Sequence, residues 1–443
     1  MQNQGIRDAR SLGTPKLLVL GLQHMFAMFG ATVLVPALTG LSVSATLLFA
    51  GLGTLFFHFL TKGKVPAFLG SSFAYLAGYA AIAPNGEAAL LPYACVGVAA
   101  SGLLYLILAA LVRGFGANRV MRFFPPVVTG PIIICIGMTL ANSAINNCTG
   151  SWDIALVAIL TVVIFNIWGK GMLRIIPILL GVLVSYVYAA VTGRVDFSGV
   201  ASAAWIGLPV KMENTVFSLI GNCDVNLLVT AIIAIMPIAF ATMIEHIGDI
   251  CAISSTVGAN FIADPGLHRT LLGDGLATSI ASLFGAPANT TYGENTGVLA
   301  LTRVYDPLVI RLAVIYAIIA SFCPKFAALV SAMPTGTIGG VSLILYGMIS
   351  AIGVRNLVEN QVDLSKSRNV IVVSLIISLA LGITFSSAGA ITFHVGEFTL
   401  NFSGLAVAAI VGIVVNAILP GKDYDFQNDY EYGKTTEDHG QML

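Results

Sequence analysis

The sequence predicts an all-α polytopic membrane protein whose fourteen transmembrane spans form two inverted repeats of seven. Composition is the first observation: the 443 residues are 57% hydrophobic and 9% charged, with a mean hydropathy of +0.91. A soluble domain carries about a quarter charged residues. The second is that apolar runs repeatedly reach the roughly 20 residues that cross a bilayer as a helix. The third is the placement of basic residues.

The apolar segments follow one another along the chain. We expect spans at 15–38, 43–61, 66–83, 88–112, 123–145, 152–169, 173–192, 226–250, 268–284, 287–302, 307–332, 336–353, 368–387 and 391–419. Seven precede the longest external loop, 193–225, and seven follow it. Because seven is odd, the two halves must have opposite orientations, as in transporters built from inverted repeats.

The basic residues give the orientation. With the N-terminus in the cytoplasm, all 21 Lys and Arg residues except Arg194, Lys211 and Lys325 fall in cytoplasmic loops or termini. Short loops rich in Lys and Arg stay on the cytoplasmic side. We therefore expect a multi-pass protein of the cell (plasma) membrane with both termini cytoplasmic. The polar tail is expected to be disordered.

Two segments at matching positions of the halves are unlike ordinary membrane helices. The segments 63–75 and 284–297 are rich in Gly, Pro and polar residues. Such backbone is tolerated only where protein or a water-filled cavity satisfies it. We expect spans 3 and 10 to be broken, with strand-like residues 72–75 and 289–292 forming a short antiparallel pair that leads into half-helices. The alternative is two plain helices kinked by proline.

Carboxylates in the second half are candidates for chemistry. Glu245 and Asp249 are four residues apart and share one helical face, where they repel each other, so one is a candidate proton carrier. Asp249 has a second interpretation as the cytoplasmic end of its helix. Glu294 could accept two N–H donors from a flat cyclic ligand, next to Gly293, which lets a ring approach the backbone. A helix cap is the other interpretation of Glu294.

Three further residues stand out in apolar surroundings. His24 could relay protons or hydrogen-bond a neighbouring helix. Asp274 lies deep enough to support the site by bonding the backbone of a broken segment. Phe73 offers a ring face to a planar ligand.

The sequence also excludes several classes of protein. The six cysteines are scattered without a CxxC pair, so neither a metal site nor a disulfide framework is indicated. Neither a P-loop nor an HExxH motif is present. We expect no enzyme activity, no catalytic residues, no cofactor and no nucleic-acid partner, with transport driven by an ion gradient or passive.

Several motifs together resemble the nucleobase-ascorbate transporter family. They are the pattern Glu294-Asn295-x-Gly297-x-x-x-x-Thr302-Arg303, the pair Gln23-His24, the segment Gly70-Ser71-Ser72-Phe73, and Glu245. Within that family the chain is similar to bacterial uracil permeases, through the segments 264–269 and 289–295. The resemblance covers nearly the whole chain.

The resemblance implies a core domain and a gate domain with substrate between them. The core would comprise 15–113 and 226–332 and the gate 119–192 and 333–420, with a cytoplasmic N-terminus at 1–14, an external loop at 193–225 and a cytoplasmic tail at 421–443. The implied substrate-binding residues are Phe73, Glu245, Tyr292, Gly293 and Glu294. Asp249, His24, Asn295 and Asp274 would join Glu245 and Glu294 in proton coupling or support.

The implied partners are uracil or a related nucleobase, protons, membrane lipid and a second copy of the chain in a homodimer through the gate domains. One residue departs from the uracil pattern, because Asp249 stands where a histidine is usual. Glu294 favours uracil, since xanthine and urate carriers commonly have glutamine there. A purine permease of the same family and an anion carrier of related fold stay open as alternatives, as does sodium as the coupling ion.

Overall fold

The computed structural model describes residues 5–395 and 398–421. Nearly all of the tail predicted at 421–443 lies outside the described residues. The elements are α1 (Thr14–Thr39), α2 (Val43–Leu60), β1 (Leu69–Ser71), α3 (Leu76–Ile82), α4 (Leu91–Phe115), α5 (Ala117–Met121), α6 (Pro126–Cys148), α7 (Trp152–Trp168), α8 (Met172–Ile175), α9 (Pro177–Val191), α10 (Ser198–Ser202), α11 (Val225–Ile235), α12 (Ala239–Val257), α13 (Leu267–Leu283), β2 (Asn289–Thr291), α14 (Gly293–Thr302), α15 (Pro307–Ser321), α16 (Pro324–Ser331), α17 (Thr335–Glu359), α18 (Ser367–Thr384), β3 (Ala390–Val395), β4 (Phe398–Ser403) and α19 (Gly404–Ile418).

Most of the apolar segments expected from the sequence contain a helix. Among the described residues, seven helices are long and apolar enough to cross a membrane, counting α11 and α12 as one. The pair α15 and α16 would add an eighth span bent by 87°. Shorter apolar helices are Phe73–Ile82, Trp152–Trp168, Pro177–Val191 and Gly404–Ile418. The count of fourteen crossings stays a prediction.

The broken segments 63–75 and 284–297 do form an antiparallel pair, but the first of its strands lies earlier in the chain than predicted. Leu69, Gly70 and Ser71 lie opposite Thr291, Thr290 and Asn289. The predicted strand 72–75 is wrong, because Phe73–Tyr75 form a 3-10 turn that leads into α3. The N–H of Ser72 still donates to the carbonyl of Ala288 at 3.0 Å, and the chain leaves the pair after that bond.

The predicted span 391–419 is too long, which also corrects the all-α fold class. Strands β3 (390–395) and β4 (398–403) pair antiparallel, and the helix of this segment, α19, begins only at Gly404. Thr392 and Phe393 begin an alternation of polar and apolar residues with period two, which favours a strand. Ser403 then caps α19, since its Oγ accepts the N–H of Ala406 at 3.3 Å.

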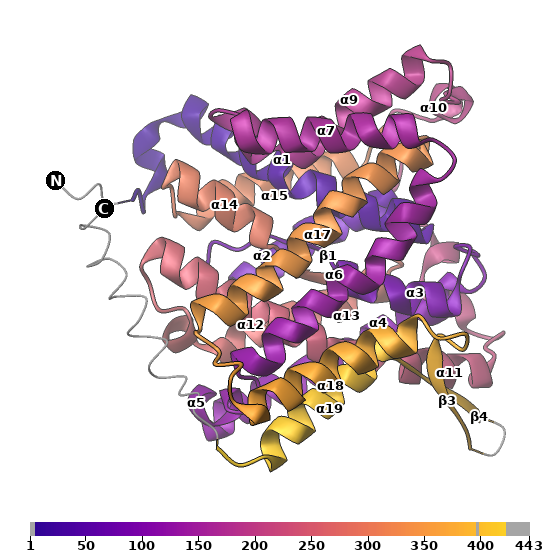
Figure 1. Cartoon of the computed structure of the whole chain (residues 1–443). Helices are drawn as coiled ribbons and strands as arrows, with labels where there is room; N and C mark the ends of the chain where they lie inside the picture. The colour runs from indigo at the N-terminus through magenta and orange to yellow at the C-terminus, as the bar shows by residue number, and fades with distance from the viewer. Residues whose placement is uncertain (1–4, 396–397, 422–443) are drawn as a thin grey trace.

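By their contacts the helices pack as two groups. Figure 1 shows two of the close pairs, α17 beside α6 and α18 beside α19. In one, α4 packs along α13, and α2 contacts α13 and α15. In the other, α17 packs along α6, and α18 packs along α19. Small residues permit close approach of helix backbones in membranes. A Cβ on Gly353 of α17 would lie 2.6 Å from the carbonyl oxygen of Gly130 on α6, so glycine is required there.

Candidate substrate-binding site

The outer edge of β1 is bonded by a side chain of α2. The N–H of Leu69 donates to Thr54 Oγ1 at 2.9 Å, and that hydroxyl lies 3.3 Å from the carbonyl of Leu69. His58 Nε2 lies 2.9 Å from the carbonyl of Ala67, just before the strand. A strand in apolar surroundings cannot leave such groups unpaired. Helix α2 therefore fixes where β1 begins.

The outer edge of β2 is bonded by α13. The N–H of Thr291 donates to Asp274 Oδ1 at 2.8 Å, and Thr278 Oγ1 donates to the carbonyl of Asn289 at 3.0 Å. Asn289 itself donates through Nδ2 to the carbonyl of Phe49 at 2.7 Å. Asp274 is fully buried. The structure therefore contains the contact predicted for Asp274, a hydrogen bond to the backbone of a broken segment.

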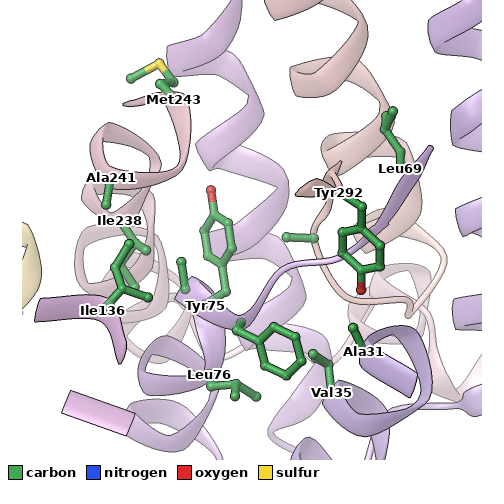
Figure 2. Packing of buried hydrophobic residues seen from close by; sticks show 14 of the residues in the cluster. Ala31, Val35, Leu69, Tyr75, Leu76, Ile136, Ile238, Ala241, Met243 and Tyr292 are labelled. Carbon is green, nitrogen blue, oxygen red and sulfur yellow. The ribbon is translucent and has the colours of Figure 1, made fainter. Parts of the chain in front are cut away.

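Tyr292 follows β2 and is bonded back onto β1. Its hydroxyl donates to the carbonyl of Ser71 at 2.7 Å and lies 3.3 Å from Thr32 Oγ1. The ring lies against Gly70, where an added Cβ would be 2.6 Å from it. Figure 2 shows Tyr292 beside Leu69 and Ala31, with its hydroxyl aimed the opposite way from that of Tyr75. The ring thus packs against the strand pair.

Each strand leads into a helix that begins near the strand pair. The 3-10 turn Phe73–Tyr75 follows Ser72, and α14 begins at Gly293 directly after Tyr292. The first N–H groups of a helix have no partner within the helix and attract negative or electron-rich atoms. Because the strands are antiparallel, the two helices begin at opposite ends of the pair, and each presents backbone donors there.

Helix α12 brings its acidic face to the start of α14. Asp249 Oδ1 would lie 3.3 Å from a Cβ on Gly293, so this carboxylate lies beside the Gly293 backbone. Glu245 and Asp249 are both half-buried, one turn apart on α12. Asp249 is eight residues from the end of α12 at Val257, so it does not mark a helix end. The backbone of Glu294 belongs to α14, but its side chain lies outside the described part of the structure.

His24 and Asn295 join α1 to α14. Asn295 Nδ2 donates to the carbonyl of His24 at 3.1 Å and lies 3.2 Å from His24 Nδ1. Both side chains are buried. His24 was predicted either to relay protons or to hydrogen-bond a neighbouring helix, and this geometry is that of the hydrogen bond.

Two residues that the sequence analysis left without a role lie beside these groups. The ring of Tyr346, on α17, meets the ring of Phe73 edge to face with centroids 5.8 Å apart. His246, on α12, lies against Thr291 and Asp274. The position of His246 next to Glu245 in the sequence could have indicated a role for it. Tyr346 is a single aromatic residue in an apolar span, and nothing in the sequence indicated a role for it.

A cavity of about 430 Å³ lies elsewhere, at the ends of α1 and α14. Its lining includes Ile6, Lys16, Thr302 and Val304. Ile6 pairs with Val304 in a parallel bridge, so the N-terminal segment forms one wall. This cavity contains none of the carboxylates or aromatic residues of the candidate site.

The chain is similar to known proteins along most of its length. The model of the permease family matches residues 15–389. The uracil permease of Bacillus caldolyticus is 41% identical, covering 96% of each chain. The uracil permease of Bacillus subtilis is 39% identical over 99% of this chain and 98% of its own, and that of Escherichia coli K12 is 38% identical over 90% of each.

Solved structures share the fold at low sequence identity. The transmembrane domain of the cyanobacterial bicarbonate transporter BicA is 12% identical with a TM-score of 0.59, covering 94% of this chain and all of that one. The murine anion transporter Slc26a9 in its inward-facing state is 12% identical with a TM-score of 0.62, covering 91% of this chain and 67% of its own. The relatives matched over the whole chain are named permeases, so this chain is a multi-pass membrane transporter and not an enzyme. It belongs to the permease family known as the nucleobase-ascorbate transporters.

Proposed function

We propose that the protein is a proton-coupled uracil importer that works by alternating access. The observation that carries this proposal is the approach of Asp249, one turn from Glu245, to the Gly293 backbone at the start of α14. It is supported by relatives named uracil permease that match over nearly the full chain.

Uracil has two ring N–H donors and two carbonyl acceptors, and the site offers groups of both kinds. Glu245 and Glu294 accept the ring N–H groups, while the backbone at Phe73 and Gly293 donates to the carbonyls. The ring of Phe73 or Tyr292 packs against the uracil plane. The contact of Phe73 with Tyr346 adds a second aromatic residue near that plane.

The substrate lies between two moving parts in this proposal. A core of 15–113 and 226–332 contributes Phe73, and a gate of 119–192 and 333–420 contributes Tyr346. Their edge-to-face contact crosses the boundary between the two helix groups, which supports a site at that boundary. Movement of the core against the gate then exposes the site to one side of the membrane at a time. A homodimer through the gate domains, with lipid around it and both termini cytoplasmic, belongs to the same proposal.

Coupling requires that the proton and uracil stabilise each other's binding. An external proton on Glu294, or on the pair Glu245 and Asp249, removes charge repulsion among neighbouring carboxylates and lets uracil bind. Loss of that proton to the cytoplasm restores the repulsion and releases uracil. The same carboxylates argue against an anion as substrate, although the solved neighbours include anion carriers.

The test is uptake of labelled uracil into proteoliposomes containing the full chain. Uptake should follow an imposed inward pH gradient and stop when the gradient is collapsed. Uptake that follows a sodium gradient instead would contradict proton coupling. Asp249 is the residue that departs from the uracil pattern, so xanthine and urate should be added as competitors; displacement of uracil by xanthine at equal concentration would favour a purine permease.

A further inference from the structure

A buried pair of ionisable side chains lies behind the candidate site. His246 Nδ1 is 3.4 Å from Asp274 Oδ1 and 3.1 Å from Thr291 Oγ1. The same Asp274 oxygen accepts the N–H of Thr291 at 2.8 Å. Both side chains of the pair have no exposed surface. The pair therefore connects α12, α13 and β2 at one point.

The surroundings of the pair offer little else that could balance a charge. The imidazole of His246 makes an edge-type contact with the ring of Phe57 and another with the ring of Tyr105, with the centroids of each pair 6.4 Å apart. Among the described residues, His246 is the one basic side chain within ion-pair distance of Asp274. The hydroxyls of Tyr75 and Tyr105 are close enough to interact electrostatically with Asp274, and also with Glu245 of α12. An ionised carboxylate buried without a counter-charge is strongly unfavourable.

We propose that His246 and Asp274 form a buried, charge-balanced positioning pair throughout the transport cycle, in which the imidazole is the counter-group of the Asp274 carboxylate. With one proton on His246 Nε2, one further proton on the pair, on His246 or on Asp274, gives zero net charge. With the charge balanced, Asp274 keeps its hydrogen bond to Thr291, and α12 keeps its position against β2. Since His246 adjoins Glu245, and Thr291 precedes Tyr292 and Gly293, the pair sets the position of the proposed uracil-binding groups without contacting the substrate.

The burial of the pair distinguishes it from the proposed coupling carboxylates. Glu245 and Asp249 are half-buried, whereas the side chains of His246 and Asp274 are enclosed by α2, α4, α12, α13 and β2. In this proposal the buried pair therefore has a positioning role, and the half-buried carboxylates are the coupling groups.

Three variants of the full chain test the charge balance. His246→Gln leaves the Asp274 carboxylate without its partner, so the thermal midpoint should fall and uracil affinity should weaken by more than about tenfold. Asp274→Asn keeps an oxygen for the Thr291 N–H and removes the charge, so its effect should be smaller. The double variant His246→Gln/Asp274→Asn should recover most of what His246→Gln loses, because no charge is then left unbalanced.

His58→Gln is the matched control, because His58 is another buried histidine of the same helix group and bonds a backbone carbonyl. Asp274→Asn should not rescue it. If the losses of His246→Gln and Asp274→Asn add in the double variant, the pair has only a packing role and the proposal is overturned.

The proposal uses the proposed function only for the uracil-affinity readout. The thermal midpoint is measured on the ligand-free protein and does not require uracil. If the unmodified chain does not bind uracil, the proposed function is wrong. The recovery of the thermal midpoint in the double variant still tests the pair in that case.

Discussion

At the scale of single residues, the geometry of the candidate site depends on how closely neighbouring side chains and backbone can approach each other. Asp249 shows this most directly, since its carboxylate lies beside a glycine backbone and not at a helix end. The sequence predicted that Glu245 and Asp249 share a face, because a spacing of four is a property of any helix. It could not predict that this face meets Gly293, which comes from a segment more than forty residues later in the chain.

Asp249→Asn tests the assignment of Asp249 to the proton. The amide keeps the shape of the side chain and cannot ionise, so uracil binding should be retained while uptake against a gradient is lost. Equilibrium binding in detergent and accumulation in proteoliposomes measure the two separately. Wild-type accumulation by the variant would remove Asp249 from coupling.

Gly70→Ala tests the contact between β1 and the Tyr292 ring. The new methyl group would lie 2.6 Å from that ring and 2.9 Å from Thr32 Oγ1, so Tyr292 must move off the strand. We expect a loss of about 1–3 kcal/mol of stability and weaker uracil binding. Gly382→Ala is the control, because nothing lies within 4 Å of a Cβ there. Equal thermal midpoints for the two variants would contradict the packing described for Tyr292.

At the scale of elements, the strand pair was predictable as a break and not as a register. Gly, Pro and Asn in apolar surroundings indicated where the helices stop, because those residues disrupt helices or need polar partners. The register depends on Thr54 and Asp274, which lie on other helices and are not adjacent in sequence. The strands 390–395 and 398–403 were not predicted, for a different reason. Their apolar residues continue into the following helix, so hydropathy alone does not separate the two. Only the alternation of polar and apolar residues distinguishes the strands from the helix.

Thr54→Val tests whether α2 fixes β1. Removal of the hydroxyl leaves the buried N–H of Leu69 without its acceptor, so stability should fall by about 1–3 kcal/mol. Thr161→Val is the matched control, since that hydroxyl bonds only the carbonyl of Val157 in its own helix among the described contacts. Thermal unfolding of both variants in the same detergent makes the comparison. If Thr161→Val loses as much stability as Thr54→Val, the hydrogen bond to the edge of β1 contributes no more than a hydrogen bond within a helix.

At the scale of the whole molecule, composition and basic residues predicted a multi-pass membrane protein, and the relatives confirm that class. Those signals are strong because each span must be apolar over its length. The division into core and gate came from resemblance, since no local pattern says which spans move together. The division therefore stays a proposal, and the contacts between the two packed groups of helices, such as that of α1 with α9, are where it can be tested.

A disulfide between α1 and α9 would test relative movement of the two groups. A Cβ on Gly30 would lie 3.4 Å from the Cβ of Ile178, close to the separation of about 3.5–4.5 Å found in disulfides. In a background with the six native cysteines replaced, Gly30→Cys/Ile178→Cys should cross-link on oxidation and stop uracil uptake, while reduction restores it. Both positions lie outside the proposed uracil-binding groups, so binding in detergent should persist in the linked form. Each single cysteine variant controls for the substitutions themselves. Full uptake by a protein whose cross-link is verified by non-reducing peptide mapping would mean that α1 and α9 move together, and the core would then have to be redrawn to include α9.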